Sequence, residues 1–294
     1  MNTTFTFELI SQWDKIWKGQ DLYKAIENCR KDDLLNSIFA KYLPKNDKIL
    51  EAGCGIGSWV VYLKELGYDI IGVDIVPYCI QLCKKVFPSV DIRVGDVRSL
   101  NFPDNFFGGY ISLGVVEHMI EGPEVVLKEA KRVLKNGGVG IFTVPAFNYF
   151  QKIYFPLRNI IATALKENNF LRKILKKDLI VNKKEFKIKL QEIRRNLRSG
   201  LWPILGVQEG KPVFCEYRYP RNYLDKIFIE MGFKIIVSKP AFYPVVFYST
   251  FGSIMMRNKS LTELNIFGKI LKKFFDFFGP YFFNMYLLYV VRKI

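Results

Sequence analysis

The sequence predicts an α/β chain built around a doubly wound parallel sheet, on three observations. Between Lys48 and Pro145, short apolar runs alternate with amphipathic helical patterns at intervals of roughly 20 residues. The runs are apolar throughout, as in strands buried on both faces. Three glycines, Gly53, Gly55 and Gly57, directly follow the first run, where a strand would turn into its helix. This alternation is typical of a sheet covered by helices on both sides.

The elements follow one another in βαβ order. Strands are expected at residues 48–53, 69–75, 91–97, 106–115 and 139–145, with helices at 58–67, 77–87 and 122–138, the last closing at Gly137. Residues 5–43 before this unit have a helical pattern. After residue 212 a helix at 219–233 and strands at 234–243 and 286–293 resume the rhythm. The phenylalanine-rich stretch before the last strand contains Asp276, Gly279 and Pro280, so we expect a buried loop there, with an interfacial segment as the alternative.

The chain divides into four parts by composition. Residues 1–44 form a helical N-terminal cap, 45–146 the core, 147–212 a basic amphipathic insertion, and 213–294 the remainder of the same domain. Residues 1–150 hold 17 Lys and Arg against 18 Asp and Glu, so the net charge of +16 comes from the second half. A basic amphipathic insertion suits an anionic membrane surface, and a lid packed on its own domain is the alternative.

The five cysteines and the single histidine indicate the cellular compartment of the protein and whether it binds a metal ion. The cysteines show no paired spacing, and the N-terminus lacks a basic-then-apolar pattern. We therefore expect a cytoplasmic protein, peripheral at the inner membrane surface if the insertion binds lipid. Without a CxxC pair we expect no metal site.

The glycine loop is followed by two carboxylates at the ends of the next two strands. The loop, "EAGCGIG", spaces its glycines as G-x-G-x-G, with Glu51 before them. Asp74 ends the second strand, where a carboxylate can accept hydrogen bonds from both hydroxyls of a ribose. Asp96 ends the third, where it can accept from an adenine amino group. A ligand with ribose and adenine but no pyrophosphate fits these acceptors, and S-adenosylmethionine is such a ligand.

These motifs resemble the class I S-adenosylmethionine-dependent methyltransferases, of the type 11-like kind that acts on small molecules and lipids. The resemblance covers "EAGCGIG", "GVDI", "GDVRSLNFPDNFFGGYISLGVVEH" and "LKEAKRVLKNGGVGIFTVP", roughly residues 45–146. It implies a Rossmann-like, mainly parallel seven-stranded sheet and S-adenosylmethionine as cofactor. It also implies cofactor contacts at these residues: Glu51, Gly53, Cys54, Gly55, Gly57, Asp74, Ile75, Asp96, Val97 and Leu113.

His118 is the candidate catalytic residue, because it follows the fourth strand at the edge where the reacting group is expected. A neutral imidazole there can accept a proton from a hydroxyl; a purely structural histidine is the alternative. "LGVVEH" stands where amino-methylating relatives carry an Asn/Asp-Pro-Pro-aromatic turn, which disfavours methylation of DNA adenine or protein glutamine. Five further residues are candidates for the acceptor side: Trp13, Trp17, Glu216, Tyr217 and Arg218.

The expected function is methyl transfer from S-adenosylmethionine to a small-molecule or lipid-linked acceptor, at an oxygen atom. The aromatic content of 16% favours an apolar or ring-containing acceptor. Two alternatives stay open. The basic second half could follow an RNA backbone, although nucleic acid is the less expected partner, or the chain could be a non-catalytic assembly factor that binds S-adenosylmethionine.

Overall fold

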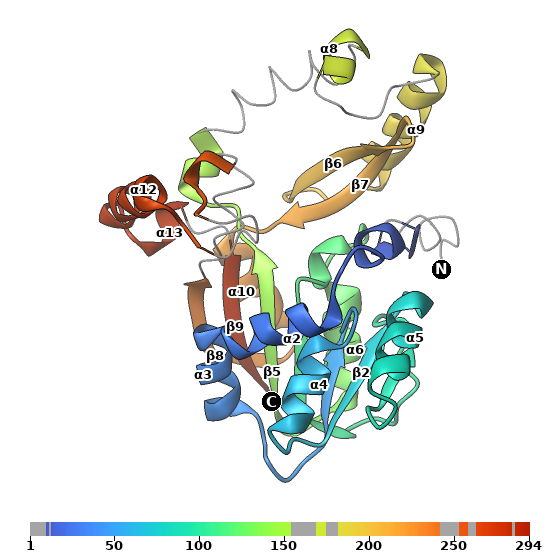
Figure 1. Ribbon diagram of the computed structural model, residues 1–294, viewed down its shortest axis with the longest axis vertical. Coiled ribbons are helices and arrows are strands. Elements are labelled where there is room, and N and C mark those ends of the chain that lie inside the picture. Colours follow the sequence, from blue (N-terminus) through green and yellow to red (C-terminus); the bar gives the residue numbers. More distant parts are fainter. Residues whose placement is uncertain are drawn as a thin grey trace.

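The structure is a computed structural model that describes residues 10–11, 13–153, 169–174, 182–241, 253–257, 263–283 and 286–294. One central sheet carries helices on both faces, and a hairpin with further helices lies beyond one end of its strands (Figure 1). The predicted α/β class is confirmed.

Seven strands form the sheet, in the order β3-β2-β1-β4-β5-β9-β8. Their bounds are β1 Ile49–Ala52, β2 Ile70–Asp74, β3 Ile92–Val94, β4 Phe107–Leu113, β5 Leu134–Pro145, β8 Phe233–Ala241 and β9 Tyr286–Lys293. The first five are parallel, whereas β9 lies antiparallel between β5 and β8. Because the order reverses at β1, a crevice opens beyond the carboxyl ends of β1 and β4, where such sheets bind ligands.

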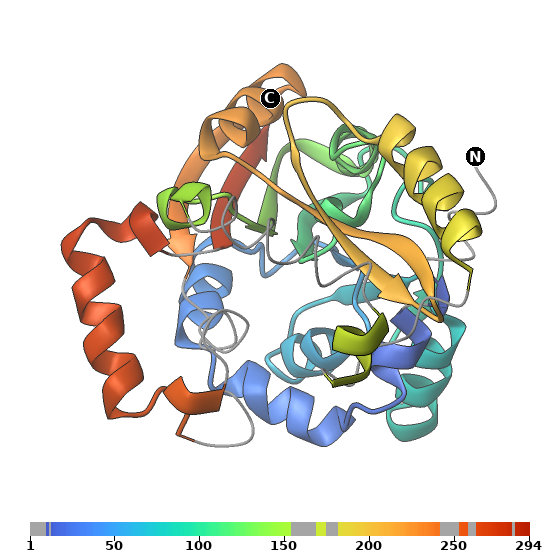
Figure 2. The same cartoon turned by 90° about the horizontal axis from the view of Figure 1, so that it is seen from above.

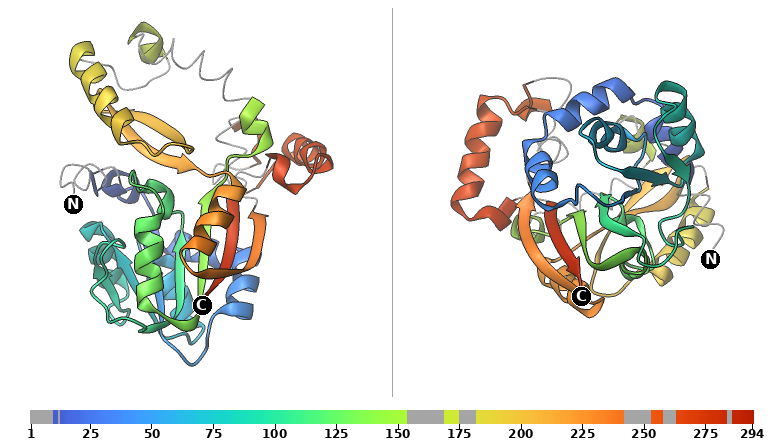
Figure 3. Two further views of the ribbon diagram at one scale, coloured as in Figure 1. Left: turned by 180° about the vertical axis from the view of Figure 1, so that it is seen from behind. Right: turned by 90° about the horizontal axis from the view of Figure 1, so that it is seen from below.

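Alternate strand residues pack against different helices on the two faces of the sheet. Ile49, Ile111 and Ile141 join the core beneath four helices, α2 Leu22–Arg30, α3 Asp33–Tyr42, α4 Ser58–Glu65 and α5 Pro77–Val86. Leu50 and Phe142 join the core beneath α6 Glu124–Val133 and α10 Arg221–Glu230. Figure 3 shows the two helical layers from behind and from below. This burial on both faces explains why the strand sequences are apolar throughout.

The helix predicted at 122–138 ends earlier than expected. α6 stops at Val133, and β5 begins at Leu134, which is fully buried and pairs with Phe107 of β4. Gly137 has the expected positive φ of 76°, but it lies within the strand. The predicted end at Gly137 is therefore wrong, because pairing with β4 takes over before the glycine is reached.

An unpredicted β-hairpin crosses the expected boundary at residue 212 between the basic insertion and the remainder of the domain. After α8 Asn169–Ile174 and α9 Lys183–Asn196 come β6 Trp202–Gln208 and β7 Lys211–Arg218, paired antiparallel. The turn residues Glu209 and Gly210 both have positive φ, 50° and 77°, as a two-residue hairpin requires. Seen from above, the hairpin crosses over the sheet with α9 beside it (Figure 2).

Helix α9 uses its apolar side within the molecule. Phe186 and Ile193 are buried, and Ile193 belongs to the core that includes α6 and α10. This packing favours the lid interpretation for α9. Residues 154–168 and 175–181 of the predicted amphipathic insertion lie outside the described residues.

The phenylalanine-rich stretch near the C-terminus is helical before it reaches β9. After the short helix η2 Ser253–Met255 come α12 Ile266–Phe277 and α13 Pro280–Phe283. Phe275 and Phe283 are buried, whereas Phe274 and Phe277 are exposed. The expectation of a buried loop is therefore wrong for this segment, although the predicted last strand is present. Among the described helices, none has the length and apolar character needed to cross a membrane.

Candidate functional site

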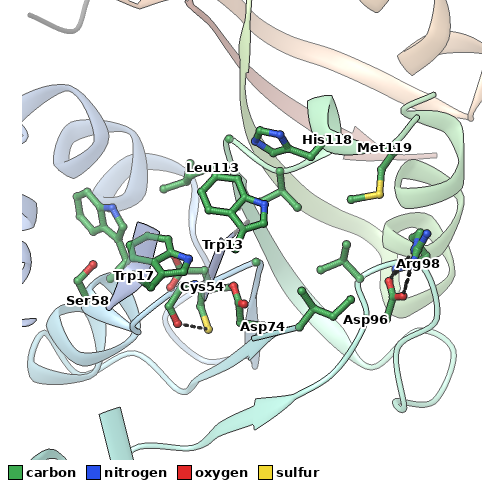
Figure 4. A pocket seen from close by; sticks show the side chains of 18 residues that line it. Trp13, Trp17, Cys54, Ser58, Asp74, Asp96, Arg98, Leu113, His118 and Met119 are labelled. Carbon is green, nitrogen blue, oxygen red and sulfur yellow. Dashed lines mark hydrogen bonds and ion pairs between the residues drawn. The ribbon is translucent and has the colours of Figure 1, made fainter. Parts of the chain in front are cut away.

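A cavity of about 330 Å³ lies at the carboxyl ends of the central strands. Its walls come from the loop after β1, the ends of β2 and β3, the loop after β4, and the helical residues 13–17. Most of the predicted site residues line it, namely Trp13, Trp17, Glu51, Gly53, Cys54, Gly55, Asp74, Ile75, Asp96, Val97, Leu113 and His118. Figure 4 shows the side chains that point into this space. Gly57, Glu216, Tyr217 and Arg218 do not line it.

The three glycines of the loop serve different purposes. Gly53, Gly55 and Gly57 have φ of 81°, 53° and 80°, in the region that favours glycine. A Cβ on Gly53 would lie 2.4 Å from Val115, and one on Gly55 would lie 2.5 Å from the Trp17 ring. These two keep the backbone close to the cavity. Gly57 instead lets α4 approach its neighbours, because a Cβ there would meet Cys83 Sγ and Ile92 Cδ1, both at 2.8 Å.

Asp74 is fixed by backbone hydrogen bonds on both carboxylate oxygens. The Gly55 amide donates to Oδ2 at 2.8 Å, and the Val76 amide donates to Oδ1 at 2.9 Å. Since a carboxylate oxygen can accept two bonds, each retains capacity for a ligand hydroxyl. Burial raises the pKa of Asp74 above its ordinary value. The geometry fits the predicted role as a bidentate ribose acceptor.

Glu51 lies beneath the glycine loop as a buried carboxylate with an unused oxygen. Its side chain is 4% exposed, and Oε2 has no hydrogen-bond partner among the described residues. Burial, reinforced by the neighbouring Asp74 carboxylate, holds the pKa of Glu51 well above its usual range. A buried acceptor without a donor is costly, and a cationic ligand group would relieve that cost.

Asp96 is already engaged by a residue that the sequence analysis overlooked. Arg98 donates to Asp96 from its backbone amide at 2.9 Å and from Nη2 at 2.7 Å. Arg98 itself lines the cavity, so it borders the region predicted for adenine. An arginine two residues beyond the carboxylate was a visible signal for this pair. Ile75, Val97 and Leu113 supply apolar surface to the same cavity.

His118 is held in a defined tautomer. Its Nδ1 lies 2.6 Å from the carbonyl oxygen of Cys215, and because a carbonyl can only accept, Nδ1 is assigned the proton. Nε2 is then left as a proton acceptor, 3.9 Å from Oε1 of Glu117. Burial lowers the pKa of His118, which keeps the imidazole neutral. The Trp13 ring meets the imidazole edge-to-face at 4.8 Å between centroids.

Behind His118 lies a group of charged residues, in which Glu117 from the segment after β4 is buried and Glu216 and Arg218 from β7 are partly buried. Glu117, His118 and Glu216 present ligand atoms within 4.8 Å of one another. Arg218 pairs with Glu216 at 2.6 Å, and its Nε is buried without a hydrogen-bond partner among the residues that the structure describes. Because this guanidinium already neutralises Glu216, the group favours a polar organic ligand over a metal ion.

Tyr217 and the two tryptophans have distinct environments. Tyr217 is fully buried, donates to the Ile120 carbonyl at 2.9 Å and accepts from the Arg198 amide at 2.8 Å. It therefore braces β7 against the loop after β4, and the structure does not bring it to the cavity as predicted. Trp13 and Trp17 stack at 6.0 Å between centroids and cover the cavity. Both rings also pack against the core beneath α2 to α5, so they join the N-terminal helical residues to the body of the molecule while they line the cavity.

The cavity fits S-adenosylmethionine on its donor set. The unused Glu51 oxygen suits an ammonium group, and the Asp74 carboxylate suits two ribose hydroxyls. Asp74, which has no cationic partner among its hydrogen-bond donors, also complements the positive charge of a sulfonium ligand. No feature of the described residues requires a negatively charged cofactor there.

Comparison with known proteins places the similarity in the same region. Residues 50–142 match the family described as methyltransferase domain. A Mycolicibacterium smegmatis protein named "probable S-adenosylmethionine-dependent methyltransferase" is 32% identical over 97 residues, which cover 33% of this chain and 37% of that protein. Demethylmenaquinone methyltransferase of Staphylococcus aureus is 31% identical over 123 residues, 38% of this chain and 51% of the enzyme.

A solved structure extends the similarity in fold to most of the chain. A S-adenosylmethionine-dependent methyltransferase from Methanosarcina mazei superposes with a TM-score of 0.54 at 17% identity, covering 87% of this chain and 97% of that one. By contrast, the chain spans between about a third and a half of the length of the curated relatives it matches in sequence. The similarity in sequence is thus limited to about a third of the chain, which includes the glycine loop and Asp74.

Proposed function

Residues 50–142 form a class I S-adenosylmethionine-dependent methyltransferase domain, and on this premise we propose that the chain methylates an oxygen atom of a small-molecule or lipid-linked acceptor. The observation that carries the proposal is the tautomer of His118. Its Nδ1 is committed to the Cys215 carbonyl, so Nε2 is the ring nitrogen left to accept a proton, and His118 lines the cavity. When bound, S-adenosylmethionine supplies an electrophilic methyl group.

A hydroxyl acceptor gives His118 a definite task. A hydroxyl holds its proton tightly and becomes a better nucleophile as the proton leaves. In the proposed reaction the O–H bond breaks and the proton moves to Nε2 of His118. The Cys215 carbonyl orients the ring, and burial keeps it neutral beforehand.

The surroundings of His118 support an apolar or ring-containing acceptor. Trp13, Leu113, Val115 and Met119 line the cavity near the imidazole. Beyond the imidazole, Glu117 Oε2 and Arg218 Nε are buried without hydrogen-bond partners among the described residues. Neither Glu117 nor Arg218 lines the cavity, so these two atoms lie behind the wall that His118 forms.

The test is transfer of an isotope-labelled methyl group to a panel of acceptors. S-adenosylmethionine with a ¹³C-methyl group is incubated with hydroxylated aromatics, a membrane lipid extract, demethylmenaquinone and total tRNA. The carbon chemical shift of the product distinguishes methyl on oxygen from methyl on nitrogen or carbon. We expect an O-methyl product that His118→Asn abolishes. A product on nitrogen or carbon would overturn the oxygen assignment, and label in tRNA would favour the RNA alternative.

A second measurement separates catalysis from binding. Calorimetric titration with S-adenosylmethionine measures cofactor affinity without any acceptor. Cofactor binding with no labelled product across the panel would favour the non-catalytic assembly factor.

A further inference from the structure

Helix α12, Ile266–Phe277, presents a row of large apolar side chains to the outside of the molecule. We call them the α12 apolar face; each is more than half exposed, and the set is Ile266, Phe267, Ile270, Phe274 and Phe277. Phe277 reaches 85% exposure. Figures 1 and 2 show α12 at the periphery, away from the central sheet. Contiguous apolar surface of this kind marks an interaction site.

The opposite side of α12 packs against the rest of the protein. The α12 apolar face is therefore the outer side of a helix that is already packed. Phe275 is buried in a small cluster with Met256, Leu264 and Phe283. Gly268 also faces inward, since a Cβ there would lie 2.5 Å from the Met255 carbonyl oxygen. At about 100° per residue, the five residues of the apolar face fall within an arc of roughly 100°. They therefore form one continuous surface along the helix.

Positive charge borders this surface on one side. Lys269 and Lys273 are exposed, and by helical spacing both lie next to the arc, with Lys273 nearest to Ile266. Lys272 pairs with Asp276 at 2.6 Å, farther round the helix. Lysine stems can lie along apolar surface while their ammonium groups reach an aqueous layer of phosphates.

We propose that α12 is an interfacial helix that docks the protein on an anionic lipid bilayer. Five large apolar side chains would enter the boundary between headgroups and acyl chains, and Lys269 and Lys273 would lie among the phosphates. At about 1.5 Å per residue, the helix is roughly 18 Å long, which suits a position in the plane of the surface. The proposal does not depend on methyl transfer or on the identity of the acceptor.

A matched pair of variants tests which basic helix binds lipid. Ile270 in α12 and Ile188 in α9 are 60% and 59% exposed, and both lie in lysine-rich helices. Ile270→Asp and Ile188→Asp thus introduce the same change in residue and charge at equal exposure. Flotation is measured with mixed phosphatidylcholine and phosphatidylglycerol vesicles, and with phosphatidylcholine vesicles alone. Calorimetric binding of S-adenosylmethionine confirms that each variant is folded.

We expect the wild-type chain to float with the anionic vesicles and Ile270→Asp to lose about tenfold or more in partition. Ile188→Asp should float like the wild type. If Ile270→Asp fails to fold, Phe277→Ser at the most exposed position replaces it. A variant without transferase activity, such as His118→Asn, should still float, which separates this proposal from the proposed function.

Three results would overturn the proposal. The wild-type chain could remain with the soluble fraction, or Ile270→Asp could float as well as the wild type. Both isoleucine variants could also lose binding equally, which would place the contact elsewhere. A separate measurement of the oligomeric state by sedimentation velocity tests another occupant of the same face. A wild-type dimer that Ile270→Asp dissociates would make the α12 apolar face an interface between two copies of the chain.

Discussion

The two walls of the cavity are built in different ways. Except for Leu113, the cofactor wall comes from one segment, residues 51–98, and its key carboxylate Asp74 is fixed by amides of Gly55 and Val76 within that segment. The acceptor wall joins segments 97 residues apart, since His118 is oriented by the Cys215 carbonyl of β7. Because the residues of the cofactor wall are close together in sequence, the sequence reveals that wall. The acceptor wall takes its final form only when the β6–β7 hairpin packs against His118.

The largest expected effect concerns the acceptor wall. His118→Gln should lower kcat by about 10²–10⁴-fold, the range for loss of a general base, with cofactor affinity unchanged. Wild-type activity should rise with pH as the imidazole loses its proton. Because burial lowers the pKa of His118, this rise should be centred below 6.5. A pH–rate profile that keeps the same acidic limb in the variant would contradict the assignment.

A pair of glycines probes how tightly the cofactor wall is packed. Gly57 and Gly67 have nearly equal φ of 80° and 82°, but an added Cβ meets Cys83 and Ile92 only at Gly57. Gly57→Ala should therefore cost about 1–3 kcal/mol more in unfolding free energy than Gly67→Ala, the usual range for overpacking. Urea denaturation of both variants measures the difference. Equal costs would mean that backbone strain alone matters at Gly57.

Cofactor affinity distinguishes the two aspartates of the same wall. Asp74→Ala should weaken S-adenosylmethionine binding by about 1–3 kcal/mol, the scale for hydrogen bonds to a charged group. Binding should also weaken as the pH falls through the raised pKa of Asp74. Asp96→Ala should have the smaller effect, because Arg98 already occupies that carboxylate. Calorimetry measures both affinities. A larger loss of affinity in Asp96→Ala than in Asp74→Ala would make Asp96 the dominant contact.

The smallest expected effect is a gain in stability on the acceptor wall. Burial raises the pKa of Glu117, so the folded state binds more protons than the unfolded state above the ordinary carboxyl pKa. Stability is then lost as pH rises from that value towards the raised pKa. Glu117→Gln should stabilise the protein by about 1 kcal/mol at pH 8, with no gain near pH 4. Glu230 is exposed, so Glu230→Gln is the control. Thermal unfolding of both variants at pH 8 and near pH 4 measures the change in stability.

The sequence predicted the elements whose signals are local. The glycine loop, the strand end at Asp74 and the βαβ order all depend on residues within about 20 positions of each other, which is the range of periodicity and capping signals. The third strand ends at Val94, two residues before the predicted Asp96, which still reaches the cavity. The structure brings these residues to one cavity. His118 was identified from its place after a strand, but its orientation was not, because Cys215 is remote in sequence.

The errors also have physical causes. The β6–β7 hairpin was hidden in a lysine-rich context, although Glu209-Gly210 between apolar runs was an available turn signal. Tyr217 was expected at the cavity on the basis of residue type, but its hydroxyl braces the fold. The phenylalanines of α12 were expected to be buried because composition alone does not reveal which side of a helix is covered.

The antiparallel β9 has a consequence for synthesis of the protein. β8 pairs with β9 alone among the described strands, and β5 receives its second neighbour from β9 as well. Until residues 286–293 have left the ribosome, both β5 and β8 therefore present open strand edges. Such edges can pair with other chains, so the nascent protein is open to aggregation through β5 and β8 in the interval before β9 is added.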